Sequence, residues 1–120
     1  MVAFNFSPEH VPKVESGEKL QTIRRTKRGN VGDLAQLYTG MRTKACRKLR
    51  SPDPPLVMVD YVGIRPDGLT FGNVTKHPRN IDECASMDGF KDFAEMVAWF
   101  TAKYGSPFFT GYLHRWAPKP

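Results

Sequence analysis

Hydrophobic and polar residues alternate along several short stretches of the chain. In residues 19–25, Thr22 and Arg24 fall in one alternating set and Ile23 falls in the other. A period of two with β-branched members is typical of a β-strand, whose two sets of side chains point to opposite faces. The stretches in which we expect strands are residues 19–25, 34–39, 43–49, 56–64, 68–74 and 107–116.

A period of three to four residues replaces this alternation in one later stretch. The apolar residues that follow it are Phe90, Phe93, Met96, Val97, Phe100 and Tyr104. They form one stripe, which predicts a long helix between Met87 and Gly105 that packs on the sheet and ends at the glycine. Asp88 stands where this helix is expected to begin, and aspartate is a preferred N-cap residue.

The N-terminal region carries the signals of a second, shorter helix. Ser7 is a suitable N-cap, and Pro8 suits the first helical position. Gly17 suits the left-handed residue that closes a helix. Pro12 lies between these ends, so we expect the helix to be short or distorted.

These elements together predict an α+β fold. Turn-forming sequences separate the strands, and Ser51–Pro55 holds three prolines that cannot join the interior of a sheet. We expect five to six strands in a curled sheet or small β-barrel, with one long packed helix and a short N-terminal helix. With 40% hydrophobic residues in 120, the chain suits one domain over residues 1–120, with a frayed tail at 117–120.

Charge is distributed unevenly between the two halves of the chain. Residues 1–50 hold 11 Lys and Arg against 4 Asp and Glu, whereas residues 51–120 hold 7 against 8. The excess lies in two clusters, Lys19–Arg28 and Arg42–Arg50. A basic half predicts a face for an anionic partner, nucleic acid first and a nucleotide second. An ordinary solvated basic surface is the alternative.

Other classes of protein are disfavoured by what the sequence lacks. No apolar run approaches the ~20 residues needed to cross a membrane, and the first ten residues do not resemble a secretory signal. We therefore expect a cytoplasmic protein, monomeric and without membrane contact. Cys46 and Cys84 have no metal-binding spacing, so we expect free thiols, no metal and no cofactor.

One motif resembles that of a known family. Gly17–Lys19 followed by Gln21–Arg24 resembles the motif of the ASCH domain family, a branch of the PUA-like β-barrels. Three later segments are also similar to the family pattern. They are the turn at Gly32-Asp33, the acidic residue before the long helix in Met87–Phe90, and the aromatic final strand at Phe108–Trp116. The resemblance implies a small PUA-like barrel that binds RNA or nucleotides in a cleft.

The resemblance also implies a possible chemistry. Some small bacterial members are amidohydrolases that remove the acetyl group from N4-acetylcytidine with a lysine, a threonine and a glutamate. By motif position these roles fall on Lys19, Thr22 and Asp88, the last of which is one carbon shorter than glutamate. A carboxylate withdrawn by ~1.5 Å can lose its contact, and such misplacement can cost ~100-fold in rate.

Three functions follow as hypotheses. The first is a module that binds RNA, a nucleoside or a nucleotide in a basic cleft around Lys19, Thr22 and Arg24. The second is an amidohydrolase in which Thr22 is the nucleophile, Lys19 the base and Asp88 the polarising carboxylate. The third is a non-catalytic protein-interaction module. The cations that we expect to contact the ligand or nucleic acid are Arg24, Arg25, Lys27, Arg28, Arg42, Arg47 and Lys48.

Several of these residues have a structural alternative. The alternative for Asp88 is that it caps the helix and has no role in the site. Asp82 and Glu83 are then the next candidates for the site carboxylate. The basic stretch Arg42–Lys48 is either an edge strand guarded by charge or a phosphate track beside the cleft. Residues assigned to packing or to loops, with at most a minor role in a site, are His10, Tyr38, Tyr61, His77, Trp99, His114 and Trp116.

Overall fold

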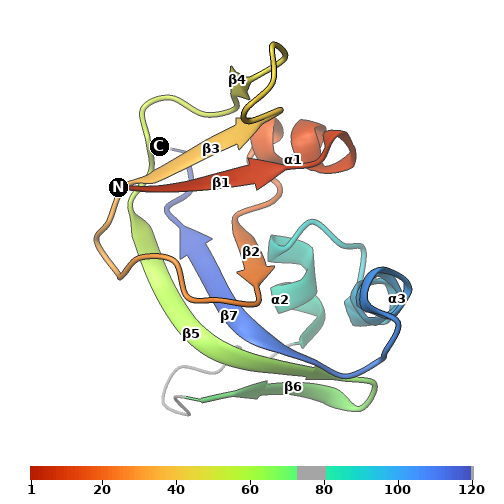
Figure 1. The fold of residues 1–120 in the computed structure, drawn as a ribbon. Helices are drawn as coiled ribbons and strands as arrows, with labels where there is room; N and C mark the ends of the chain where they lie inside the picture. Colours follow the sequence, from red (N-terminus) through yellow and green to blue (C-terminus); the bar gives the residue numbers. More distant parts are fainter. Residues whose placement is uncertain (73–80, 120) are drawn as a thin grey trace.

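The computed structural model describes residues 1–72 and 81–119, which form two sheets and their helices (Figure 1). The smaller sheet has the order β1-β3-β4. Its strands are β1 (Val2–Phe6), β3 (Ala35–Thr39) and β4 (Arg47–Lys48). β1 and β3 are parallel, so the chain between them crosses over through the first helices and one strand of the other sheet.

The larger sheet is antiparallel and has the order β2-β7-β5-β6. Its strands are β2 (Gln21–Arg24), β5 (Leu56–Arg65), β6 (Gly68–Phe71) and β7 (Phe109–Trp116). β2 is an edge strand paired only with β7, and Thr22 lies opposite His114. The free edge of β2 is where the candidate site lies.

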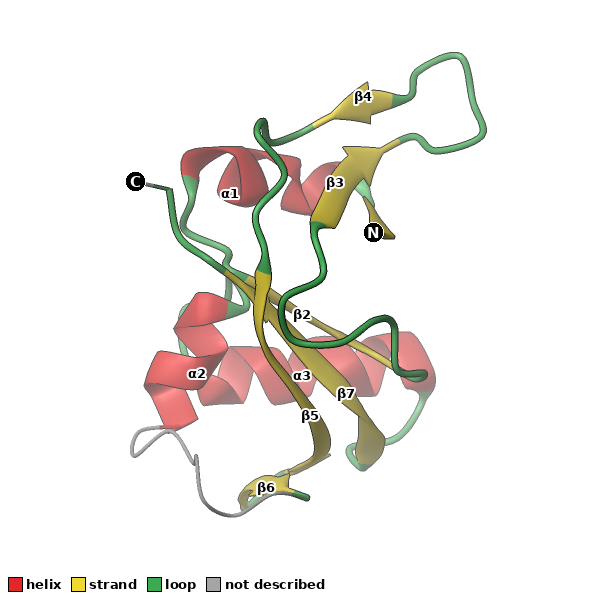
Figure 2. Cartoon of the chain, turned by 90° about the vertical axis from the view of Figure 1, so that its left-hand side faces the viewer, coloured by secondary structure: helices red, strands yellow, loops and turns green. Residues whose placement is uncertain are grey.

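Four helical segments surround these sheets. They are the 3₁₀ turn η1 (Pro8–His10), α1 (Val11–Ser16), α2 (Ile81–Met87) and α3 (Phe93–Tyr104). α2 and α3 lie on the larger sheet, whereas α1 lies beside the smaller one (Figure 2). No helix in the described ranges is long and apolar enough to cross a membrane.

Two hydrophobic clusters hold the layers together. One joins α2 and α3 to the larger sheet, and the other joins the smaller sheet to α1. The long strands contribute to both clusters, since Leu113 of β7 lies in the first and Trp116 in the second. β5 and β7 therefore connect the two halves of the fold.

The α+β class, the short N-terminal helix and its glycine end are confirmed. Gly17 is left-handed with a φ of 88°, and Pro12 splits the segment into a 3₁₀ turn and a short α-helix. The described residues do not form a closed barrel, because β1 and β2 belong to different sheets. The predicted PUA-like barrel is thus not seen.

Other element predictions need correction. The expected strand at residues 43–49 is reduced to Arg47–Lys48, because residues 40–46 form turns. β1 and α2 were not predicted, and the end of the expected strand at 68–74 lies outside the described residues. The described chain therefore holds seven strands instead of the predicted five to six.

The long helix begins later than predicted. Asp88 does not cap it, because Asp88 follows the last residue of α2 and Gly89 turns the chain with a φ of 93°. The N-cap of α3 is Asp92, whose carboxylate accepts a hydrogen bond from the Glu95 amide at 2.9 Å. Asp82 adds a second contact, since its carboxylate accepts from the Phe93 amide at 2.9 Å.

Candidate functional site

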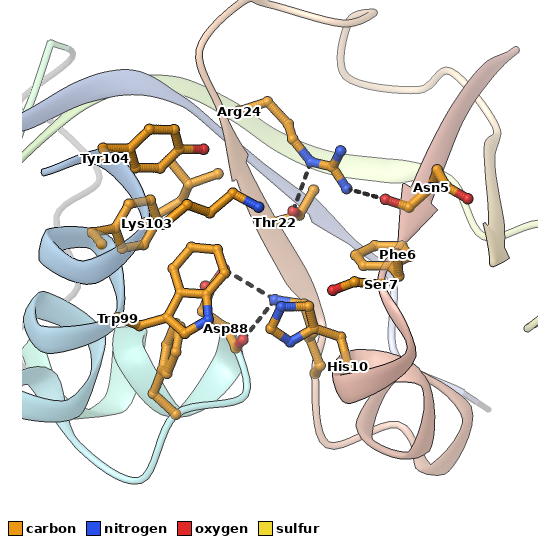
Figure 3. Close-up of a pocket in the computed structure, with 14 residues that line it drawn as sticks. Asn5, Phe6, Ser7, His10, Thr22, Arg24, Asp88, Trp99, Lys103 and Tyr104 are labelled. Atoms are coloured by element: carbon orange, nitrogen blue, oxygen red, sulfur yellow. Dashed lines mark hydrogen bonds and ion pairs between the residues drawn. The ribbon is translucent and has the colours of Figure 1, made fainter. Parts of the chain in front are cut away.

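A pocket of about 210 Å³ opens at the free edge of β2, between the β1–η1 corner and α3 (Figure 3). Apart from Ile23, its apolar wall is aromatic: Phe6, Phe90, Trp99, Phe100 and Tyr104. Its polar end holds Lys19, Thr22, Arg24 and Asp88. The structure thus brings four of the predicted site residues into one cavity.

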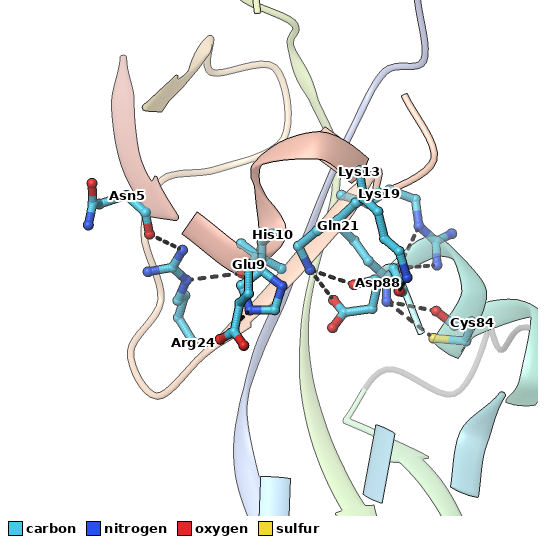
Figure 4. A network of polar contacts seen from close by, with 12 residues as sticks. Asn5, Glu9, His10, Lys13, Lys19, Gln21, Arg24, Cys84 and Asp88 are labelled. Carbon is cyan, nitrogen blue, oxygen red and sulfur yellow. Dashed lines mark hydrogen bonds and ion pairs between the residues drawn. The ribbon is translucent and has the colours of Figure 1, made fainter. Parts of the chain in front are cut away.

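Lys19 and Asp88 form a buried pair at the base of this pocket (Figure 4). Their side chains are each only 4% exposed. Lys19 Nζ donates a hydrogen bond to the main-chain oxygen of Asp88 at 2.6 Å, and it lies 3.5 Å from Asp88 Oδ1. Two groups, the carbonyl and the carboxylate, therefore hold the amine in place.

The position of Asp88 follows from the end of α2. Its amide donates to the main-chain oxygens of Cys84 and Ala85, so the residue continues the last turn of the helix. Gly89 then turns the chain, and a Cβ there would lie 3.4 Å from Lys19 Cδ. The turn thus packs directly against the lysine stem.

Burial shifts the pKa of both partners. It lowers the pKa of Lys19, although the charge of Asp88 opposes this shift. It raises the pKa of Asp88 to about 6, although Lys19 and Arg24 favour the ionised form. Asp88 Oδ1 accepts no hydrogen bond from the described residues. Burial thus disfavours the charged form of both groups.

Arg24 spans the gap between the two sheets. Its Nε donates to Thr22 Oγ1 at 3.0 Å, and its Nη2 donates to the main-chain oxygen of Asn5 at 2.9 Å. The guanidinium carbon lies 5.3 Å from the centre of the Phe6 ring. Because Thr22 Oγ1 accepts from Arg24, the hydroxyl proton of Thr22 remains available for donation.

The other predicted cations lie outside this pocket. Arg25 does not line it, although its guanidinium carbon lies 4.7 Å from the ring centre of Tyr104 in the pocket wall. Arg47 pairs with Glu15 at 2.6 Å and Lys48 with Asp53 at 2.7 Å, as expected of a charged sheet edge. The pocket is also not lined by Lys27, Arg28 or Arg42.

Several lining residues were missed by the sequence analysis. Trp99 and Lys103 were overlooked because the apolar residues of the long helix were assigned to packing alone. Their spacing of four residues places them on one face of that helix, and this was the available signal. Lys103 Nζ lies 5.1 Å from the Trp99 ring centre. His10 was expected in a loop, yet its half-buried ring contacts Trp99 edge-on at 5.5 Å. His77 lies outside the described residues.

His114 is buried on β7, opposite Thr22 of the neighbouring strand β2. Its Nε2 accepts a hydrogen bond from the Arg28 amide at 2.9 Å, and burial lowers its pKa to about 4. The neutral ring therefore acts as an acceptor that fixes the loop after β2. It does not line the pocket.

Comparison with known proteins adds no family to this geometry. No protein-family model matches the chain, and neither a curated protein nor a solved structure matches it. The ASCH resemblance stays a prediction carried chiefly by Gly17–Arg24.

Proposed function

We propose that the pocket binds a ligand that carries a nucleobase: a nucleoside, a nucleotide or one nucleotide of RNA. The observation that carries this proposal is the pairing of an aromatic wall with a buried polar end in one cavity. A base has an apolar face that stacks on aromatic rings and a polar edge that needs donors and acceptors. Trp99 supplies an aromatic ring for the apolar face of the base. Lys19, Thr22 and Asp88 supply donors and acceptors for its polar edge.

The size of the pocket supports one base at a time. Its volume of about 210 Å³ is below the ~300 Å³ at which sites for drug-sized ligands begin. One ring system fills such a space, and the sugar then lies at the mouth beside Arg24 and Lys103. In RNA the remaining nucleotides would lie on the surface.

Titration with nucleosides, followed by tryptophan fluorescence and calorimetry, tests this proposal. Trp99 fluorescence should change on binding. Thr22→Val should weaken affinity about tenfold by removing a hydroxyl contact, and Asp88→Asn should do so by removing the carboxylate charge. Arg47→Gln is the matched control, because Arg47 lies outside the pocket. Absence of binding in the folded wild type, or equal losses in the control, would reject the proposal.

Amidohydrolysis is a second candidate, favoured by one observation: a lysine of lowered pKa, a threonine and a carboxylate share the pocket. Neutral Lys19 takes the Thr22 hydroxyl proton as the oxygen attacks the acyl carbon of an N4-acetylcytidine-type amide. The exocyclic amine of cytosine leaves with that proton, and water then hydrolyses the acetyl-threonine ester, which releases acetate and regenerates Thr22. In the free protein Lys19 instead donates to Asp88, so this route requires the amine to reorient when ligand binds.

Turnover of N4-acetylcytidine without added metal tests this second candidate. Lys19→Ala and Thr22→Ala should each abolish conversion to cytidine, whereas Asp88→Glu should raise it if the shorter carboxylate limits the rate. Conversion that survives either alanine substitution would place the chemistry elsewhere. A wild type that binds cytidine but converts nothing would leave the binding function alone.

A further inference from the structure

A second cavity, of about 310 Å³, adjoins the pocket. It is lined by Ala3, Asn5, Arg28, Met41 and Arg42, and it shares Asn5 with the pocket. Its two arginines come from two loops, one after β2 and one after β3. They are the only charged residues that line it.

The loop that carries Arg28 is fixed against β1. The Arg28 amide donates a hydrogen bond to the buried His114 ring at 2.9 Å. Gly29 follows with a φ of 80°, and a Cβ there would lie 2.7 Å from a methyl carbon of Val2. Only glycine permits this close approach, so the backbone holds Arg28 beside the edge of β1.

The loop that carries Arg42 is fixed in a strained form. Arg42 has a φ of 66° and is the one non-glycine residue of the described chain with a positive φ. This left-handed conformation is uncommon for a residue with a long side chain, and it persists only where its surroundings impose it. The Met41 amide donates to Asn5 Oδ1 at 3.0 Å, which ties this loop to the strand between the two cavities.

The cations here have no carboxylate partner. Within the described ranges, no ion pair involves Arg24, Arg28 or Arg42. The guanidinium carbons of Arg24 and Arg28 lie 5.6 and 5.9 Å from the centre of the same Phe4 ring. Exposed cations without a carboxylate partner leave this cavity positively charged, so it suits an anion.

We propose that Arg28 and Arg42 bind a phosphate group of the ligand whose base occupies the pocket. The inference rests on the proposed function and narrows it: the ligand is a nucleotide, not a bare nucleoside. Arginine suits this role because its planar fork donates two parallel hydrogen bonds to phosphate oxygens. The phosphate comes either from a free nucleotide (a monoester) or from a strand (a diester).

The test compares the affinities of matched ligands at fixed ionic strength. The probes are the four ribonucleosides, their 5′- and 3′-monophosphates and the corresponding dinucleoside monophosphates, followed by Trp99 fluorescence and calorimetry. At least one phosphorylated probe should bind tenfold or more tightly than its nucleoside. Tighter binding of a monoester identifies a free nucleotide, and tighter binding of a diester identifies a strand.

Two substitutions locate the phosphate. Arg28→Gln and Arg42→Asn should each lower the ratio of nucleotide affinity to nucleoside affinity about tenfold. The affinity for the nucleoside itself should stay unchanged. Asparagine tolerates the left-handed conformation, so Arg42→Asn should keep or raise the melting temperature. Lys44→Gln is the matched control: it removes the same charge from the same loop but does not line the cavity.

The outcomes separate this inference from the function on which it rests. Equal affinity for nucleoside and nucleotide overturns the phosphate site and leaves the base pocket standing. A preference that survives both arginine substitutions, or that falls equally in Lys44→Gln, overturns the assignment to these residues. Absence of binding to every probe overturns both proposals.

Discussion

The pocket and the edge strand β4 of the smaller sheet both contribute to ion pairs, but in opposite surroundings. Arg47 and Glu15 approach to 2.6 Å with side chains 53% and 41% exposed. Lys19 and Asp88 are farther apart, at 3.5 Å, with side chains only 4% exposed. We expect the shorter pair to have the smaller coupling energy, because water screens the attraction between exposed charges. Water does not screen the attraction between buried charges in this way.

This difference shows where the fold carries a cost. Burying an unpaired amine or carboxylate is expensive, and mutual attraction repays only part of the desolvation. Two hydrophobic side chains would fill the same space without this desolvation cost. The burial of Lys19 and Asp88 at the base of an aromatic pocket therefore carries a cost in stability, and a perturbed pair in a pocket supports our proposal that it contacts a ligand.

The largest expected effect comes from breaking the buried pair. Asp88→Ala or Lys19→Ala should each lower the free energy of unfolding by about 3–5 kcal/mol, because each leaves the other group buried without its partner. Urea denaturation measures this loss. The double variant Lys19→Met with Asp88→Leu is the control and should be less destabilised than either single change. Single losses below ~1 kcal/mol would contradict the assignment of a buried ion pair.

The next effect is a pH dependence that comes from Asp88. Its pKa is about 6 in the folded protein against 3.8 in the reference state, so the folded protein holds the proton more tightly. Its contribution to stability is thus greatest below pH 3.8 and falls as the pH rises towards about 6. At ~1.36 kcal/mol per unit the loss reaches about 3 kcal/mol.

Unfolding of the wild type and Asp88→Asn between pH 3.5 and 7 measures this contribution. The asparagine variant should lack the slope that Asp88 causes. The lowered pKa of Lys19 acts in the opposite direction at alkaline pH, where stability should recover as the pH rises towards 10.5. Parallel pH profiles in the two proteins would reject the shift of Asp88.

A smaller effect distinguishes Asp92 from Asp88. Asp92 caps α3, so Asp92→Ala should cost about 1 kcal/mol and Asp92→Asn almost nothing. Neither change should alter ligand affinity, because Asp92 does not line the pocket. Thermal denaturation and nucleoside titration together check this. A loss of affinity in Asp92→Asn would contradict the division of roles between the two aspartates.

The smallest effect is expected at the exposed pair. Arg47→Gln and Glu15→Gln should leave stability within the error of a denaturation measurement, alone and together, since both side chains remain hydrated. A double-mutant cycle at low and high salt measures the coupling. A coupling comparable to that of Lys19 and Asp88 would remove the contrast between the two regions.

Part of the site could be predicted because it is local in sequence. Thr22 and Arg24 are two residues apart on one strand, so the period of two places both on one face. Gly17 could be assigned to a helix end for a similar reason. β1 was missed although Val2, Phe4 and Phe6 show the same alternation.

The remainder depends on contacts between distant segments. Lys19 is buried by a turn about 70 residues later, and nothing near the lysine in sequence signals this. The start of α3 was misplaced because Phe90 continues the helical period across the Gly89 turn. The two loops that carry Arg28 and Arg42 line one cavity because both contact β1: a Cβ at Gly29 would touch Val2, and the Met41 amide donates to Asn5 Oδ1.

A crystal structure of the protein with a bound nucleotide would test the central claim most directly. Our account predicts the base against Trp99, with its polar edge within hydrogen-bonding distance of Lys19, Thr22 or Asp88, and the phosphate between Arg28 and Arg42. A base bound elsewhere, or an empty pocket at a saturating ligand concentration, would contradict it.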